Sequence, residues 1–175
     1  MYNKMGQKFG LFRLLTTFFY IIAGSSALAQ PLDAPSGEPI LTIEGNITNT
    51  NVGDTAQFDR AMLESMGMVS FVTSTPWYSE PSEFEGVPLA ELMERVGAQG
   101  TEVEVVALND YRAQIPISDF STFGTILALK RNGEEMPIRD KGPLFVVYPY
   151  DEESRLQNQD YYARSVWQVY KLIVQ

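Results

Sequence analysis

The chain has 175 residues, with 13 Lys and Arg against 22 Asp and Glu, and it contains neither Cys nor His. The acidic balance repels phosphate backbones and therefore argues against nucleic acid as a partner. Without thiols or imidazoles the chain has no disulfide, and it lacks the commonest metal ligand and the commonest general base, which argues against most enzyme mechanisms.

Residues 1–29 have the pattern of a signal peptide. A basic segment precedes an apolar stretch of about ten residues, and Ala27-Leu28-Ala29 supplies a cleavage signal. The apolar stretch is shorter than the roughly 20 residues of a membrane-spanning helix. We therefore expect a periplasmic protein that is not embedded in the membrane. The mature chain, residues 30–175, would carry 10 basic and 22 acidic residues and a formal charge of −12.

The mature chain begins with a polar, Pro-bearing segment over residues 30–39, which we expect to be a flexible lead-in. Alternation of apolar and polar residues over 40–47 predicts the first strand. A helix is predicted next, capped by Asp54 or Thr55, and its apolar residues keep helical spacing until Gly67.

A strand over residues 68–73 leads into a loop of small hydroxyl residues that carries Trp77. A Trp in such a loop either covers the edge of the core or offers a flat ring to a flat ligand, and both readings stay open. A short helix is then predicted from Leu89 to Gly97, with Pro88 at its first turn.

Two hairpins are predicted in the middle of the chain. Each has a turn signal between two apolar runs, and Asn-Gly is the stronger of the two signals. The elements are strands 101–108 and 111–115 around Asn109-Asp110, and strands 125–131 and 134–138 around Asn132-Gly133.

The stretch from Met136 to Asp151 contains the most apolar strand of the chain. Residues 144–147 lack polar alternation, which predicts a central strand covered on both faces. A charged loop precedes this strand and aromatic residues follow it, so its ends are either solvated turns or a site. Beyond it we expect a polar loop over 152–160, a turn or helix start at Arg164 and a closing strand over 168–174.

These elements predict one α+β domain of mixed sheets with a few short helices over residues 40–175. Several short motifs also occur in a fixed order along it, namely Phe84-Glu85-Gly86-Val87-Pro88-Leu89, Ala107-Leu108-Asn109-Asp110-Tyr111, Leu127-Ala128, Asn132-Gly133-Glu134, Gly142-Pro143-Leu144 and Trp167. This series resembles the molybdopterin-binding domain of the sulfite oxidase superfamily. The resemblance implies a sulfite-oxidase-type fold with a groove shaped for a pterin.

The chain departs from that family at one place. In the enzymes of the family a Cys thiolate after an early strand ligates molybdenum, whereas here the comparable segment, Phe71 to Trp77, contains no Cys. Molybdenum is therefore not expected. The chain is similar to small exported members that bind a free pterin, oxidised or reduced, and that regulate a membrane-bound cyclic-di-GMP enzyme. The resemblance thus implies the outer domain of a membrane signalling protein as the partner.

A pterin is a flat bicycle whose edge presents donors beside an acceptor, so it needs an aromatic face, a carboxylate and several donors. The resemblance places these roles in loops around the groove. The candidates are Trp77 or Tyr150 for stacking, Asp140 or Asp110 for the amino edge, Lys141, Arg164 and Ser165 as donors, and Tyr111, Arg139, Arg155 and Trp167 around them.

Each candidate also has a structural reading: Asp110 could complete the turn, Arg139 and Arg155 could form solvated ion pairs, and Trp167 could belong to the core. The chain has no G-x-S-x-G motif and no recognisable pair of catalytic carboxylates, so a non-catalytic protein is predicted. Two alternatives remain: a molybdopterin-dependent oxidoreductase or its degenerate subunit, and a pure protein-interaction module.

Overall fold

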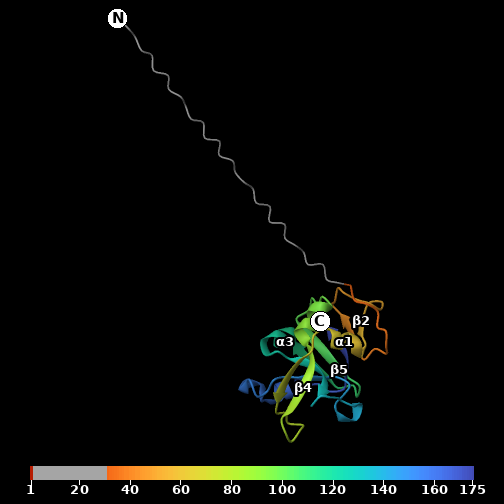
Figure 1. Ribbon diagram of the computed structural model, residues 1–175, viewed down its shortest axis with the longest axis vertical. Helices are drawn as coiled ribbons and strands as arrows, with labels where there is room; N and C mark the ends of the chain where they lie inside the picture. The colour runs from red at the N-terminus through yellow and green to blue at the C-terminus, as the bar shows by residue number, and fades with distance from the viewer. Residues whose placement is uncertain (2–30) are drawn as a thin grey trace.

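A computed structural model describes Met1 and residues 31–175 (Figure 1). Apart from Met1, the predicted signal peptide lies outside the described residues. Within the described residues, no helix is long and apolar enough to cross a membrane.

The domain is built from two sheets. The first contains five strands in the order β2 (Ala56–Phe58), β1 (Leu41–Gly45), β10 (Val169–Val174), β5 (Glu102–Ala107) and β6 (Arg112–Pro116). Its first and last strands in sequence, β1 and β10, pair in parallel, whereas its other neighbours are antiparallel. The second sheet has the order β3 (Val69–Thr73), β4 (Ser82–Pro88), β7 (Ile126–Arg131) and β8 (Glu134–Glu135), with β9 (Phe145–Val147) also paired to β7.

Short helices connect and cover the sheets. They are α1 (Arg60–Ser65), α2 (Leu89–Arg95), α3 (Ile117–Phe123) and α4 (Gln159–Arg164), with 3₁₀ turns at η1 (Ile138–Asp140) and η2 (Ser154–Leu156). The buried apolar side chains form a large core cluster and a smaller one. The smaller cluster lies on the second sheet, and half-buried aromatic rings pack against it, Trp77 and Trp167 among them.

Several predicted elements are confirmed. Both hairpins form, although the strand predicted over 134–138 is only the two-residue β8, and Ile138 begins η1 instead. The helix predicted from Leu89 is α2, which buries Leu89, Leu92 and Met93. The strands predicted over 40–47 and 168–174 are β1 and β10. The order of elements therefore followed from apolar periodicity and turn residues.

Three predictions about local structure were wrong. The helix expected from Asp54 or Thr55 begins only after Asp59, because Phe58 pairs with Leu41 as part of β2. Residues 145–147 are fully buried, as expected, but the strand in the middle of its sheet is β7, which has partners on both edges. Arg164 ends α4 instead of starting a helix, and α4 begins inside the predicted polar loop.

The predicted flexible lead-in makes specific contacts. Leu32 belongs to the large core cluster, and the backbone N–H groups of Ser36 and Gly37 donate to Asp59 at 2.9 and 2.8 Å. Asp59 also caps α1 by accepting from the N–H of Met62 at 2.9 Å. One carboxylate therefore fastens the lead-in to the first helix.

These hydrogen bonds predict a pH dependence of stability. The N–H groups of Met62 and Gly37 lower the pKa of Asp59 below its usual 3.8, so the stabilisation is present above the unfolded-state pKa and is lost as the pH falls. We expect Asp59→Asn to be less stable than wild type at pH 7, and the difference to shrink towards pH 3. Urea unfolding across this range would measure it, and a constant difference would contradict the expectation.

Candidate functional site

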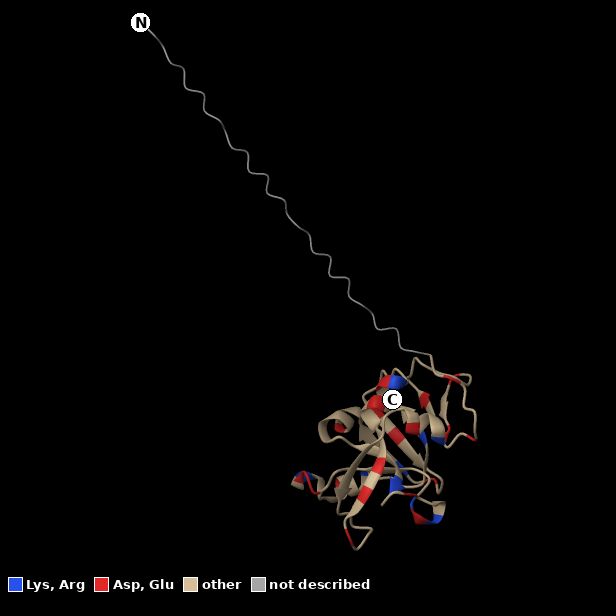
Figure 2. Cartoon of the chain, in the orientation of Figure 1, with Lys and Arg blue, Asp and Glu red and all other residues tan. Residues whose placement is uncertain are grey.

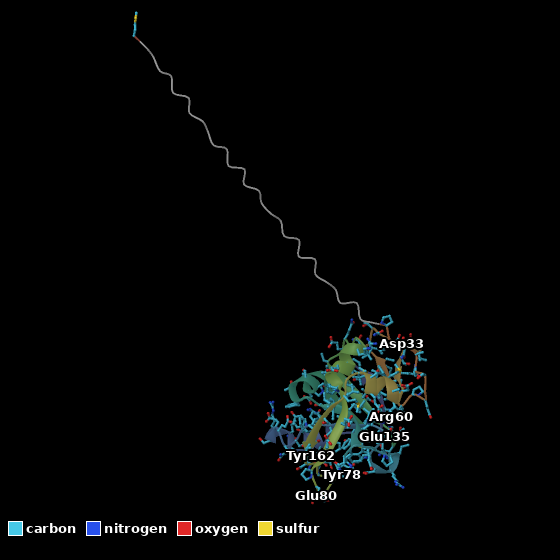
Figure 3. The ribbon with its side chains drawn as sticks, viewed as in Figure 1. Asp33, Arg60, Tyr78, Glu80, Glu135 and Tyr162 are labelled. Atoms are coloured by element: carbon cyan, nitrogen blue, oxygen red, sulfur yellow. The ribbon has the colours of Figure 1, made fainter. Side chains whose placement is uncertain are left out.

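An aromatic group surrounds Trp77, in the loop after β3. The Trp77 ring meets Phe145 and Trp167 edge to face at 5.5 Å between centroids, and it lies 6.1 Å from Tyr162 and 6.4 Å from Tyr150. Tyr78 and Tyr162 lie at the end of the molecule opposite Asp33 (Figure 3). The group joins the loop after β3, β9, α4 and the segment before β10, and two hollows adjoin it.

The first hollow, called here the aromatic slot, has a volume of about 190 Å³ and is lined by Asn109, Tyr111, Val166 and Trp167. The β5–β6 turn provides one side, because Asp110 adopts a positive φ of 64° and Asn109 accepts from the N–H of Tyr111. The Tyr111 hydroxyl donates to the carbonyl of Ala163 at 2.9 Å, which ties the turn to α4. The slot thus has aromatic walls and one amide.

The second hollow, called here the hydroxyl pocket, measures about 360 Å³ and is more open and more polar. The loop after β3 forms one side, and the N–H of Ser74 donates to Asp151 at 2.7 Å. The hydroxyl oxygen of Thr75 is buried and has no hydrogen-bond partner among the described residues. The lining residues are Ser74, Thr75, Pro76, Tyr150, Asp151, Gln157 and Tyr162.

Asp140 belongs to a cluster of charges around Tyr78. It accepts from the Tyr78 hydroxyl and from Arg131, both at 3.1 Å, and Lys141 lies 3.8 Å away. The guanidinium of Arg131 lies 3.9 Å from the centre of the Tyr78 ring. Burial, together with the hydrogen bond to Asp140, raises the pKa of Tyr78 to about 12, so the phenol stays protonated at neutral pH. The carboxylate oxygens of Asp140 are thus engaged inside the protein.

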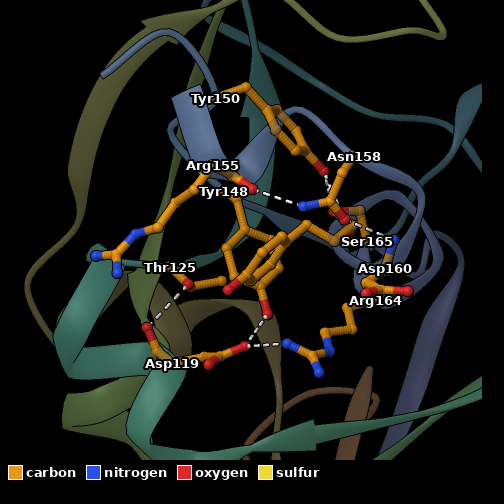
Figure 4. A network of polar contacts seen from close by, with 10 residues as sticks. Asp119, Thr125, Tyr148, Tyr150, Arg155, Asn158, Asp160, Arg164 and Ser165 are labelled. Carbon is orange, nitrogen blue, oxygen red and sulfur yellow. Dashed lines mark hydrogen bonds and ion pairs between the residues drawn. The ribbon is translucent and has the colours of Figure 1, made fainter. Parts of the chain in front are cut away.

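A second polar network joins α3, the segment after β9 and the C-terminal end of α4 (Figure 4). Asp119, which is 8% exposed, accepts from the Tyr148 hydroxyl at 3.0 Å and from Arg164 at 2.9 Å. Burial and the nearby Asp119 charge raise the pKa of Tyr148 well above its usual value. The Ser165 hydroxyl is hydrogen-bonded to that of Tyr150, and both residues are almost fully buried. Arg164 and Ser165 therefore hold the segment that continues into the slot.

The structure brings some of the predicted site residues together and separates others. Tyr111 and Trp167 line the slot, Tyr150 lines the hydroxyl pocket, and Trp77 stands between them as part of the aromatic group. Lys141 lies near the slot, with its ammonium 5.7 Å from the Trp167 ring. The other predicted site residues line neither hollow. Asp110 shapes the turn, Arg139 is exposed, and Arg155 pairs with Glu153 and stacks on Phe123. Asp140, Arg164 and Ser165 belong to the polar networks described above.

Several lining residues were not predicted as ligand contacts, and Asn109, Val166, Thr75 and Gln157 are examples. Asn109 was treated only as turn chemistry, although its neighbours Asp110 and Tyr111 were named. Val166 lies between two predicted residues and could have been included on that ground. Gln157 carries no sequence signal, because its position depends on contacts across the fold, whereas Thr75 lies in the segment that the resemblance compares with the family's metal-binding loop.

The donor set does not favour a metal centre. The described residues contain no group of three or more Asp and Glu that could hold a metal ion, and the whole chain lacks Cys and His. The loop after β3 offers hydroxyl groups where the resemblance would place a thiolate. Aromatic faces, an amide, a carboxylate and an unpartnered hydroxyl instead suit a flat organic ligand with polar edges.

Comparisons with known proteins identify the family and the fold. A family model described as oxidoreductase molybdopterin binding domain matches residues 47–152, whereas no curated protein matches the chain. Thirty solved chains match. One is the sulfane dehydrogenase SoxCD from Paracoccus pantotrophus, with a TM-score of 0.58 and 17% identity, over 77% of this chain and 37% of that one. At this identity the likeness concerns the fold, and the chain spans little more than a third of SoxCD.

Proposed function

Because the chain belongs to the oxidoreductase molybdopterin-binding domain family, we propose that it is an exported, non-catalytic protein that binds a free pterin. In this proposal it reports the bound pterin to the outer domain of a membrane-bound signalling protein of the cyclic-di-GMP type. The fold is the sulfite-oxidase-type α+β fold, and the family supports pterin binding.

The observation that carries the ligand half of the proposal is the aromatic slot. Ligand pockets for drug-sized molecules measure roughly 300–1,000 Å³, whereas the slot measures about 190 Å³. This volume suits a two-ring ligand without a large attached group. The rings of Tyr111 and Trp167 can contact the faces of a pterin, while the Asn109 amide can both donate to and accept from its polar edge.

The non-catalytic part of the proposal is supported by the chemistry of the hydroxyl pocket. Bound in the family's usual way, the molybdenum cofactor would supply oxygen-atom transfer, and it would need a thiolate in the loop after β3. That loop contributes Ser74 and Thr75 instead, and among the described residues that line the pocket Asp151 alone is charged. A carboxylate repels a phosphorylated cofactor, so the residues of this pocket do not suit the molybdenum cofactor.

Pterin binding can be tested with a matched pair of variants at one position. Purified mature protein is titrated with 6-hydroxymethylpterin and with its tetrahydro form while Trp fluorescence is followed. Because Tyr111→Ala removes a stacking face, we expect it to weaken binding by about tenfold. Tyr111→Phe keeps the ring and should bind within about twofold of wild type.

Two results would contradict this proposal. One is the absence of saturable binding for both forms of the pterin. The other is equal affinity for wild type and Tyr111→Ala, which would place the ligand outside the slot. Metal analysis of the periplasmically expressed protein separates the oxidoreductase alternative, because that alternative requires stoichiometric molybdenum.

A further inference from the structure

Strand β3 forms one edge of the second sheet. It pairs with β4 along its whole length, from Val69 opposite Gly86 to Thr73 opposite Ser82. Among the described residues, no strand pairs with its other side. Alternate residues of an edge strand direct their N–H and C=O groups outward, so β3 offers a row of backbone hydrogen-bond donors and acceptors that no other described strand pairs with.

This edge lacks the usual protection. Proteins guard long edges with Lys, Pro, bulges or covering segments, but Val69–Thr73 reads VSFVT, and its pairing with β4 shows no register shift. Val72 is 61% exposed and Val69 is 43% exposed, the two most exposed apolar side chains of the second sheet. The exposed Val residues add apolar surface to the free backbone groups.

Acidic residues lie on β4, the strand that pairs with β3. Glu83 and Glu85 belong to β4, which carries acidic residues along its length in Figure 2. Val72 is opposite Glu83 and Ser70 is opposite Glu85, and residues directly opposite each other share a face. Glu85 shares Lys130 with Glu64. Glu83 accepts from the Ser70 hydroxyl at 3.2 Å and forms no ion pair with a Lys or Arg of the described chain.

We propose that the free edge of β3 is the docking surface for an extended, basic segment of a partner protein, which adds a strand to the second sheet. A Lys or Arg of that segment beside Val72 would lay its methylene stem on the exposed Val and place its charge near Glu83. The acidic net charge of −9 disfavours a second copy of the chain as the occupant. This surface could serve the partner of the proposed relay, but it does not depend on pterin binding.

The test uses short, fluorescently labelled peptides and the full mature protein. A peptide of alternating Val and Lys should bind saturably by fluorescence anisotropy, whereas one of alternating Val and Glu should not. The Val-Lys peptide with N-methylated amides along one edge should lose its binding, because it cannot form the ladder. Glu83→Gln should weaken binding by about three- to tenfold, while Glu80→Gln, in the exposed loop before β4, should change it little.

Val72→Lys should abolish peptide binding by placing a cation on the edge itself, while pterin titration of the same variant should match wild type. Peptide binding that is indifferent to N-methylation, to the Glu83 substitution or to Val72→Lys would overturn the proposal, and so would the absence of binding. A dimer in sedimentation velocity that Val72→Lys dissociates would assign the edge to a second copy and would also overturn it. If the wild-type protein does not bind a pterin at all, that result would contradict the proposed function alone.

Discussion

Replacing Asp119 with Ala is expected to lower the free energy of unfolding by about 3 kcal/mol, because it leaves two buried or half-buried donors without an acceptor. Those donors are the Tyr148 hydroxyl, at 3.0 Å, and the Arg164 guanidinium, at 2.9 Å. Tyr148 is fully buried, and the Arg164 side chain is only 27% exposed. Neither donor can recover full hydration in the folded state.

Chemical denaturation followed by far-UV circular dichroism would measure the effect. Tyr148→Phe removes one donor and leaves the ion pair, so it should cost only about 1 kcal/mol. Asp160→Ala, at an exposed carboxylate in the first turn of α4, should change stability by less than about 0.5 kcal/mol. A loss below about 1 kcal/mol in Asp119→Ala would show that water replaces the carboxylate at little cost.

The second large effect is expected for Gly86→Ala, with a loss of about 3 kcal/mol or more. A Cβ at Gly86 would lie 2.2 Å from the carbonyl oxygen of Leu127 and 2.5 Å from the Cα of Ala128. Both atoms belong to the backbone of β7, the strand in the middle of its sheet. The β4–β7 register shifts between Glu85 and Gly86, and the missing side chain permits that close approach.

Thermal melting of Gly86→Ala beside Glu85→Ala would test this expectation. Glu85→Ala changes the neighbouring residue without adding an atom near β7 and loses only a long contact to Lys130, so its midpoint should stay close to that of wild type. Equal melting temperatures for the two variants would show that β4 can move away from β7 at low cost.

The fold could be predicted from the sequence largely because its elements are marked locally. Asn132-Gly133 and Asn109-Asp110 lie in turns with positive φ, and Asn132 has a φ of 53°. The family that the motif order resembles is also the one whose model matches residues 47–152. What local patterns missed were short elements whose boundaries depend on distant partners, such as β2, which pairs with β1, and α1, whose cap also binds the lead-in.

The candidate site was harder to predict, because side-chain partners decide which residue faces a hollow. Tyr150 and Ser165 were named as ligand contacts. Their hydroxyl groups are hydrogen-bonded to each other, although Tyr150 also lines the hydroxyl pocket. Asp140 is engaged by Arg131, a residue with no role in the sequence argument. Tyr111 and Trp167 line the aromatic slot, and their role as ligand contacts stays a prediction.

The parallel pairing of β1 with β10 has a consequence for how the chain acquires its structure. The hydrogen-bonded neighbours of β1 are β2 and β10, and β10 runs to Val174, next to the last residue. A nascent chain therefore cannot complete the first sheet until β10 has been synthesised. Because β1 and β10 are far apart in the sequence, their pairing closes a long loop, and such non-local contacts are expected to slow folding of the first sheet.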